Sequence, residues 1–153
     1  MTNKSKAIPE GYHSITPYLI VKGGAAAIDF YKQVFGATEI MCMKMPDGRV
    51  GHAELKIGDS VIMLADEFPE METVSPATLG NSPVGLLLYV DDPDATVNLA
   101  VSLGAKLKKP VQDRMYGDRN GTIADPFGHL WTVAVHIEDV SMEEVERRMK
   151  AAK

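Results

Sequence analysis

The sequence contains very little cysteine and no long apolar run. Cys42 is its single cysteine, which excludes an intramolecular disulfide and allows a reducing compartment. No stretch approaches the roughly 18 apolar residues of a membrane span, and the first residues lead into no apolar segment like that of a secretory signal. These features predict a cytoplasmic protein that does not associate with membranes.

The sequence also lacks an excess of positive charge. The formal net charge is −5, whereas non-specific binding to nucleic acid needs a basic face that neutralises phosphates. The one basic run, residues 106–109, is interpreted as a solvated strand edge guarded by lysine. A Gly-rich strand-to-helix turn that would cradle a nucleotide-like cofactor is missing as well. We therefore expect no nucleic-acid partner and no methyltransferase activity.

What remains is the composition of an ordinary globular protein, with 45% apolar and 24% charged residues. Its 153 residues suit one compact domain or two small modules. Residues 119–131 predict a strand, a turn at Asp125–Gly128 and a second strand, and residues 49–61 follow the same plan. Gly36 and Gly104 each close an amphipathic stretch at a similar spacing. This internal period predicts a duplicated unit.

Periodicity predicts the order βαβββ in both units. The first unit spans residues 13–65 and the second 83–137; an arm (1–12) precedes them and a charged helix (138–153) follows. Residues 66–82 form a loop long enough to be a linker or a functional flap. Alternating and helical patterns set the expected ranges. The expected strands are 13–21, 38–45, 49–57, 61–65, 84–90, 105–109, 119–124 and 129–136, and the expected helices are 25–35, 93–103 and one from Ser141 onward.

This plan resembles the vicinal oxygen chelate superfamily, which includes glyoxalase I, bleomycin-resistance proteins and extradiol dioxygenases. The resemblance is carried by Ile28–Ala37, which closes the first helix, and by Asp125–Gly128 before the last strand. Ile15–Leu19, His52–Leu55 and Tyr116–Arg119 look like the PhnB-like branch. The resemblance implies an α+β fold in which two tandem units form a cup-shaped, barrel-like mixed sheet with helices outside. It also implies a homodimer, because units of this superfamily pair between chains as well as within them.

In the superfamily the cup can hold a divalent metal on four side chains. The resemblance places those four positions at Thr16, Met63, Gly85 and Thr132. None of them supplies the imidazole, carboxylate or thiolate that zinc and nickel prefer. We therefore expect no metal ligands at these positions and no cofactor; the alternative is a relocated site for zinc, nickel, manganese or iron.

Strand alternation groups the candidate ligand-binding residues on a few faces. If these faces line the cup, its wall is apolar with a few aromatic and hydroxyl groups, which is typical of a small-molecule pocket. The alternative is that the same side chains fill a closed core. The predicted ligand-binding residues are Thr16, Tyr18, Met63, Leu87, Tyr89, Tyr116, Arg119 and Thr132.

His52 and Glu54 are the candidate catalytic residues. They lie two apart on one strand and so share a face, which allows them to act as base and orienter or as a partial metal site. The alternative is a solvated face on which Arg49 or Arg119 pairs with Glu54. Arg119 itself is expected either to bind a ligand carboxylate or phosphate, or to pair with Asp118 or Glu54.

The methionines at 41, 43 and 45 share one strand face, where they either form an adaptable ligand surface or fill the core. Together these features predict a protein that binds a small hydrophobic or aromatic molecule without the usual metal. The alternative is a metal-dependent lyase, isomerase or dioxygenase that uses His52 and Glu54. The sequence leaves open which molecule is bound and whether any reaction is catalysed.

Overall fold

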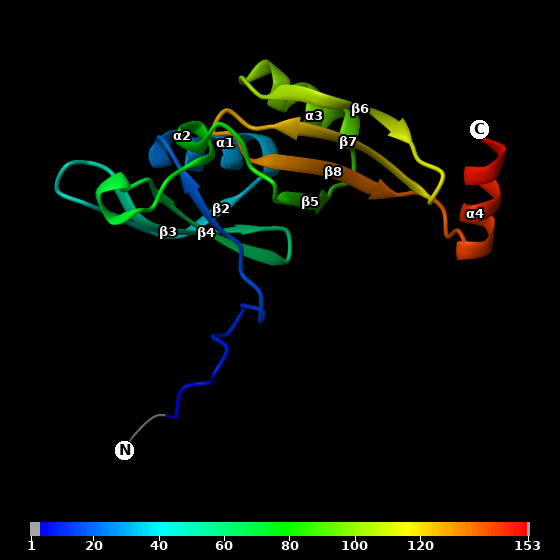
Figure 1. The fold of residues 1–153 in the computed structure, drawn as a ribbon. Coiled ribbons are helices and arrows are strands. Elements are labelled where there is room, and N and C mark those ends of the chain that lie inside the picture. The colour runs from blue at the N-terminus through cyan, green and yellow to red at the C-terminus, as the bar shows by residue number, and fades with distance from the viewer. Residues whose placement is uncertain (1–3, 153) are drawn as a thin grey trace. The chain divides into compact units, whose positions relative to one another are not determined.

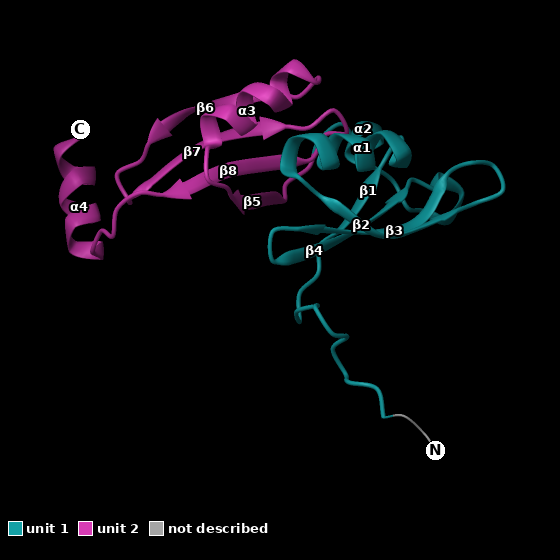
Figure 2. Cartoon of the chain, turned by 180° about the vertical axis from the view of Figure 1, so that it is seen from behind, with its two compact units in different colours: residues 1–81 teal, residues 82–153 magenta. Residues whose placement is uncertain are grey.

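The computed structural model describes residues 4–152. The chain divides into two compact units, and the boundary in the sequence lies between Asn81 and Ser82. Figure 1 shows the elements, and Figure 2 colours the two units separately. Each unit is described by itself below. The elements are β1 (Tyr18–Val21), α1 (Gly24–Phe35), β2 (Thr38–Lys44), β3 (Val50–Ile57), β4 (Ser60–Asp66), η1 (Pro69–Met71), α2 (Pro76–Leu79), β5 (Gly85–Tyr89), α3 (Pro93–Ser102), β6 (Lys106–Asp113), β7 (Asp118–Ala124), β8 (Leu130–His136) and α4 (Met142–Ala151).

The first unit is a four-stranded sheet with the order β1-β4-β3-β2. β1 runs parallel to β4, and the other neighbours are antiparallel. α1 packs on β3 and β4, and the core between helix and sheet is apolar. Its largest fully buried side chains are those of Tyr31, Leu55, Leu64, Val21 and Val50.

The second unit repeats this topology with the order β5-β8-β7-β6, again with one parallel pair, β5 and β8. α3 packs on β6, β7 and β8 and covers one face of the sheet. Gly36 and Gly104 follow the two helices with positive φ angles of 66° and 107°, conformations that favour glycine. The predicted α+β class and the duplicated βαβββ unit are confirmed.

Several expected boundaries are wrong. β1 begins at Tyr18 instead of His13, so Thr16 precedes the strand. The ladder starts at the carbonyl of Pro17, which accepts the Met63 N–H at 2.9 Å, because Pro17 has no N–H of its own to donate. β6 continues four residues beyond Lys109, through Pro110. It is an edge strand, as expected for the lysine run, and an edge tolerates the missing proline donor.

The loop after β4 contains two short helices, η1 and α2, that the sequence pattern did not predict. The Glu67 carboxylate fixes α2 in place, because it accepts hydrogen bonds from the Ser75 backbone and hydroxyl and from the Thr78 hydroxyl, at 2.7–2.9 Å. These bonds lower the pKa of Glu67 from 4.5 to about 2, and the Thr78 hydroxyl has the largest effect on it. The segment is therefore tied to the end of β4.

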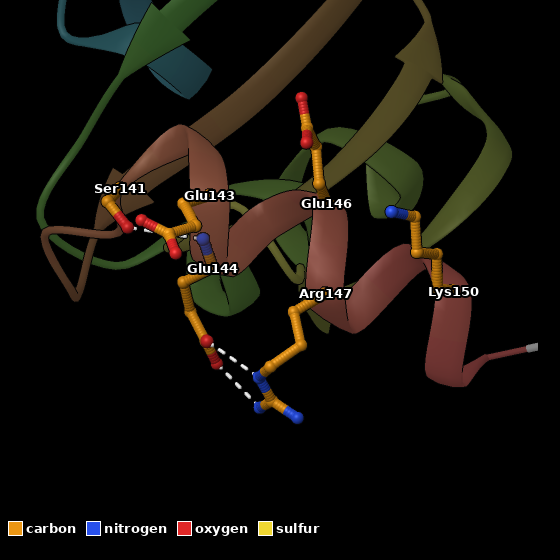
Figure 3. A pocket seen from close by; sticks show the side chains of 6 residues that line it. All are labelled: Ser141, Glu143, Glu144, Glu146, Arg147 and Lys150. Atoms are coloured by element: carbon orange, nitrogen blue, oxygen red, sulfur yellow. Dashed lines mark hydrogen bonds and ion pairs between the residues drawn. The ribbon is translucent and has the colours of Figure 1, made fainter.

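The helix from Ser141 onward is confirmed as α4, whose first turn is capped by the Ser141 hydroxyl accepting the Glu144 N–H at 3.2 Å. Figure 3 shows its outward side, where Glu144 pairs with Arg147 at 2.7 Å. Arg148 joins α4 to the rest of the second unit through the Met115 carbonyl, between β6 and β7, and the Glu138 carboxylate, after β8. Among residues 4–152, no helix combines the length and apolar character needed to cross a membrane.

The carboxylate of Asp66, at the end of β4, organises the first unit. α1 has no side-chain cap of its own at Gly23 and no acidic residue in its first turn. The buried Asp66 carboxylate supplies both, because it accepts the backbone N–H groups of Gly23 and Gly24 at 2.8 Å and that of Val50 at 2.7 Å. A side chain at Gly24 would collide with Asp66 and Val50, each within 2.8 Å of the added carbon.

We predict that Asp66→Ala lowers the free energy of unfolding by about 3 kcal/mol, because three N–H groups lose a charged acceptor in a buried place. Urea unfolding followed by circular dichroism measures this loss. Asp59→Ala, at an exposed turn position, is the control and should cost less than about 0.5 kcal/mol. Equal losses in the two variants would contradict the role given to Asp66.

Candidate functional site

The face of the first sheet that lies opposite α1 carries several of the predicted site residues. Residues paired across neighbouring strands share a face. Tyr18 pairs with Met63, Met63 with Glu54, and Glu54 with Met41, while Met43 pairs with His52. Leu19, Ala53, Leu55 and Leu64 alternate with them and are buried. We call this surface the open face, defined by Tyr18, Met41, Met43, His52, Glu54 and Met63.

A chain of hydrogen bonds crosses the open face. The Tyr18 hydroxyl lies 2.8 Å from His52 Nδ1, and His52 Nε2 lies 2.8 Å from Glu54 Oε2. The other Glu54 oxygen accepts a hydrogen bond from the Tyr12 hydroxyl. Four side chains from β1, β3 and the segment before β1 therefore act as one polar unit, which we call the Tyr–His–Glu chain.

The charge in this chain sits on Glu54. Hydrogen bonds from Tyr12 and, second, from His52 lower the pKa of Glu54, so its carboxylate is ionised at neutral pH. The bond to Glu54 raises the pKa of Tyr12, and desolvation together with the Glu54 charge raises the pKa of Tyr18. Both phenols therefore stay protonated at neutral pH.

Apolar surface surrounds the chain. Met41 and Met43 are 40% and 52% exposed, and Tyr18 is 47% exposed, so these side chains are available to a ligand instead of filling the core. Met63 is half-buried between Tyr18 and Glu54. Large apolar side chains beside a few polar groups are the usual lining of a small-molecule site.

Tyr12 is the member of this site that the sequence did not predict. It falls in residues 1–12, which were expected to be a loosely ordered arm, yet its N–H donates to the Pro9 carbonyl at 3.1 Å and its hydroxyl to Glu54. Its position as the one aromatic residue in that segment is the signal that could have indicated a role.

The second sheet also has a face opposite its helix, with three of the predicted ligand-binding residues. Leu87 pairs with Thr132, and Tyr89 pairs with Ala134. Leu87 and Tyr89 are 51% and 62% exposed. The hydroxyls of Thr122 and Thr132 are 2.9 Å apart and bond to each other. This face is therefore mostly apolar, with the threonine hydroxyls satisfied.

Tyr116 lies in the turn between β6 and β7 and joins the same sheet through Asn120. The Asn120 amide is buried; its nitrogen donates to the Tyr116 hydroxyl at 2.8 Å, and its oxygen accepts Arg114 Nε at 2.9 Å. Tyr116 itself is exposed. Arg114 and Asn120 were not among the predicted site residues, and they hold Tyr116 in position.

Arg119 lies on the helix-covered face and pairs with other residues than expected. Its guanidinium forms two 2.8 Å bonds with Asp94 of α3 and one 2.9 Å bond with Asp113. The expected pairs with Asp118 or Glu54 are wrong, because alternation turns Arg119 toward α3, while Asp118 pairs with His136 at 2.8 Å. Its ligand-binding role stays a prediction.

Arg49 does not pair with Glu54 either. It lies at the start of the β2–β3 return, where it bonds Asp47 at 2.8 Å and Glu70 at 3.1 Å and stacks over the Phe68 ring. The solvated-face alternative for Glu54 is therefore wrong in its choice of partner, because His52 and Tyr12 occupy the carboxylate.

The four positions that the resemblance assigns to metal ligands do not fit a divalent metal. Thr16 precedes β1, Met63 offers a soft thioether, Gly85 has no side chain, and the Thr132 hydroxyl bonds Thr122. Within residues 4–152, no three His, Cys, Asp or Glu side chains gather as metal ligands. His52 and Glu54 are two such donors, and the Asp66 carboxylate is taken up by backbone N–H groups.

Comparison with known proteins identifies the family. Residues 11–133 match the Glyoxalase/Bleomycin resistance protein/Dioxygenase superfamily, and the chain belongs to it. The uncharacterised protein Mb0911c of Mycobacterium bovis is 38% identical over 141 residues, which cover 90% of this chain and 93% of that protein. The superfamily resemblance expected from the sequence is confirmed.

Solved structures agree on the fold. FosX, the fosfomycin resistance protein of Listeria monocytogenes solved with Mn(II) and sulfate, has a TM-score of 0.64 at 18% identity, covering 90% of this chain and 97% of FosX. A PhnB protein from Bacillus cereus has a TM-score of 0.60 at 17% identity, covering 80% of this chain and 99% of that one. Both likenesses show the fold.

Proposed function

We propose that the protein binds a small hydrophobic or aromatic molecule on the open face of its first sheet. The observation that carries this proposal is the Tyr–His–Glu chain lying between exposed methionines. Methionine side chains adapt to ligands of different shape, and the polar chain orients one functional group of the ligand. The inherited metal positions do not fit a metal, so binding is proposed to depend on these side chains alone.

The methionine surface gives a direct test. A thermal-shift screen of aromatic compounds should yield ligands that stabilise the wild-type protein, since a ligand that binds the folded state raises its melting temperature. Met43→Glu should weaken these ligands at least about tenfold, because it places a charge beside the apolar contact. Met71→Glu is the matched control, an exposed methionine of the same unit that lies in η1, and should bind like wild type.

Two results would contradict the proposal. One is a broad screen without a single ligand. The other is a set of ligands that Met43→Glu and Met71→Glu bind equally well, which would place the binding site elsewhere.

A metal-dependent lyase, isomerase or dioxygenase is the second candidate. It is favoured by one observation, the contact of His52 with Glu54 on a face that a substrate can reach. If a metal is bound there, His52→Ala should remove both the metal and turnover. Mass spectrometry of protein purified without an affinity tag measures the bound metal. Normal metal content in His52→Ala would contradict this candidate.

Self-association is proposed as well, with a second copy of the chain as partner. Its support is the exposed apolar pair Leu87 and Tyr89 on the second sheet, since such surface is typical of interaction sites. Sedimentation equilibrium at micromolar concentration should give a dimer, and Tyr89→Glu should shift it toward monomer. A wild-type monomer under these conditions would rule the proposal out.

A further inference from the structure

The direction of each hydrogen bond in the Tyr–His–Glu chain follows from its ionised member. The Glu54 carboxylate has no hydrogen and can only accept. One of its oxygens accepts from the Tyr12 hydroxyl, and the other lies 2.8 Å from His52 Nε2. The hydrogen of that second bond must therefore sit on Nε2.

This assignment fixes the other end of the chain. A neutral imidazole with its hydrogen on Nε2 has a bare Nδ1, which can only accept. The Tyr18 hydroxyl lies 2.8 Å from Nδ1, so the phenol donates to it. The bonds run from Tyr18 to His52 to Glu54, and from Tyr12 to Glu54.

Every polar side-chain hydrogen of the Tyr–His–Glu chain is thus donated to another member of it. The phenol oxygens of Tyr18 and Tyr12 keep lone pairs that are free to accept, and the flanking side chains of Met41, Met43 and Met63 carry no strong donor. A ligand that only accepts hydrogen bonds would have to break one of the internal bonds. A ligand that donates keeps them all.

We infer that the open face selects an aromatic or apolar ligand whose polar group is a hydrogen-bond donor, a hydroxyl or an N–H, and that Tyr18 Oη receives this bond. The inference rests on the proposed function and adds the class of ligand. It also assigns Glu54 as a positioning residue, which sets the direction of the chain through His52 without contacting the ligand.

Glu54→Gln reverses the direction in which hydrogen bonds are donated between residue 54, His52 and Tyr18, while keeping the size of the side chain. The amide oxygen still accepts from Tyr12, whereas the amide nitrogen donates to His52 Nε2. The imidazole hydrogen then moves to Nδ1 and is donated to Tyr18. The Tyr18 hydroxyl becomes free to donate, and the site should now prefer an acceptor.

The experiment is isothermal titration calorimetry of the full chain at pH 8, with 2-naphthol as donor probe and 2-acetylnaphthalene as acceptor probe. Wild type should bind 2-naphthol roughly three- to tenfold more tightly. In Glu54→Gln this ratio should fall to one or below. Comparing ratios removes the difference in hydrophobicity between the two probes. Glu39→Gln, at an exposed position of β2, is the control and should keep the wild-type ratio.

The outcomes separate this inference from the proposed function. If both probes bind wild type equally, or if folded Glu54→Gln keeps the preference for 2-naphthol, the donor selectivity is overturned. If Met43→Glu still weakens binding in that case, the proposed function stands. If neither probe binds wild type, the donor selectivity is overturned, while the proposed function is decided by the broad screen of aromatic compounds. Should Glu54→Gln not fold, Tyr18→Phe removes the accepting oxygen, and a Tyr18→Phe ratio equal to that of wild type overturns the donor selectivity.

Discussion

The first unit depends on one buried carboxylate. Asp66 joins the beginning of α1, the beginning of β3 and the end of β4 by accepting three backbone N–H groups. A helix start carries partial positive charge and unpaired donors, so a negative charge from another strand stabilises it as a local cap would. Because β3 is held at Val50, the positions of His52 and Glu54 two and four residues later follow from this anchor.

The second unit has the same strand order but is held together differently. α3 begins with its own cap, the Asp92 side chain accepting the Ala95 N–H at 3.1 Å, and is tied to β7 by the bond between Asp94 and Arg119. Asp125 fixes the turn before β8 by accepting from the Phe127 and His129 backbone and from the Trp131 indole. The duplicated topology therefore tolerates different anchors. The face of its sheet also differs, because Thr132 lies where the first unit has Met63.

Patterns that are local in the sequence predicted much of this structure. The repeat, the turn glycines and the shared face of His52 and Glu54 follow from short-range periodicity, and the structure contains all three. The pairing of Arg119 with Asp94 and the role of Tyr12 do not follow from it, because they join side chains 25 and 42 residues apart. The same holds for Asp66, which contacts Gly24 across 42 residues. Such contacts depend on how strands pair, and a single sequence does not encode that pairing locally.

The central claim is that ligand binds on the open face of the first sheet. The most direct measurement is a methyl NMR spectrum of protein labelled with carbon-13 at its methionine methyl groups, recorded with and without an aromatic ligand. The account predicts that the signals of Met41, Met43 and Met63 shift on binding, while those of Met71, Met142 and Met149 stay in place. Saturable binding that leaves the first three signals unchanged would contradict it.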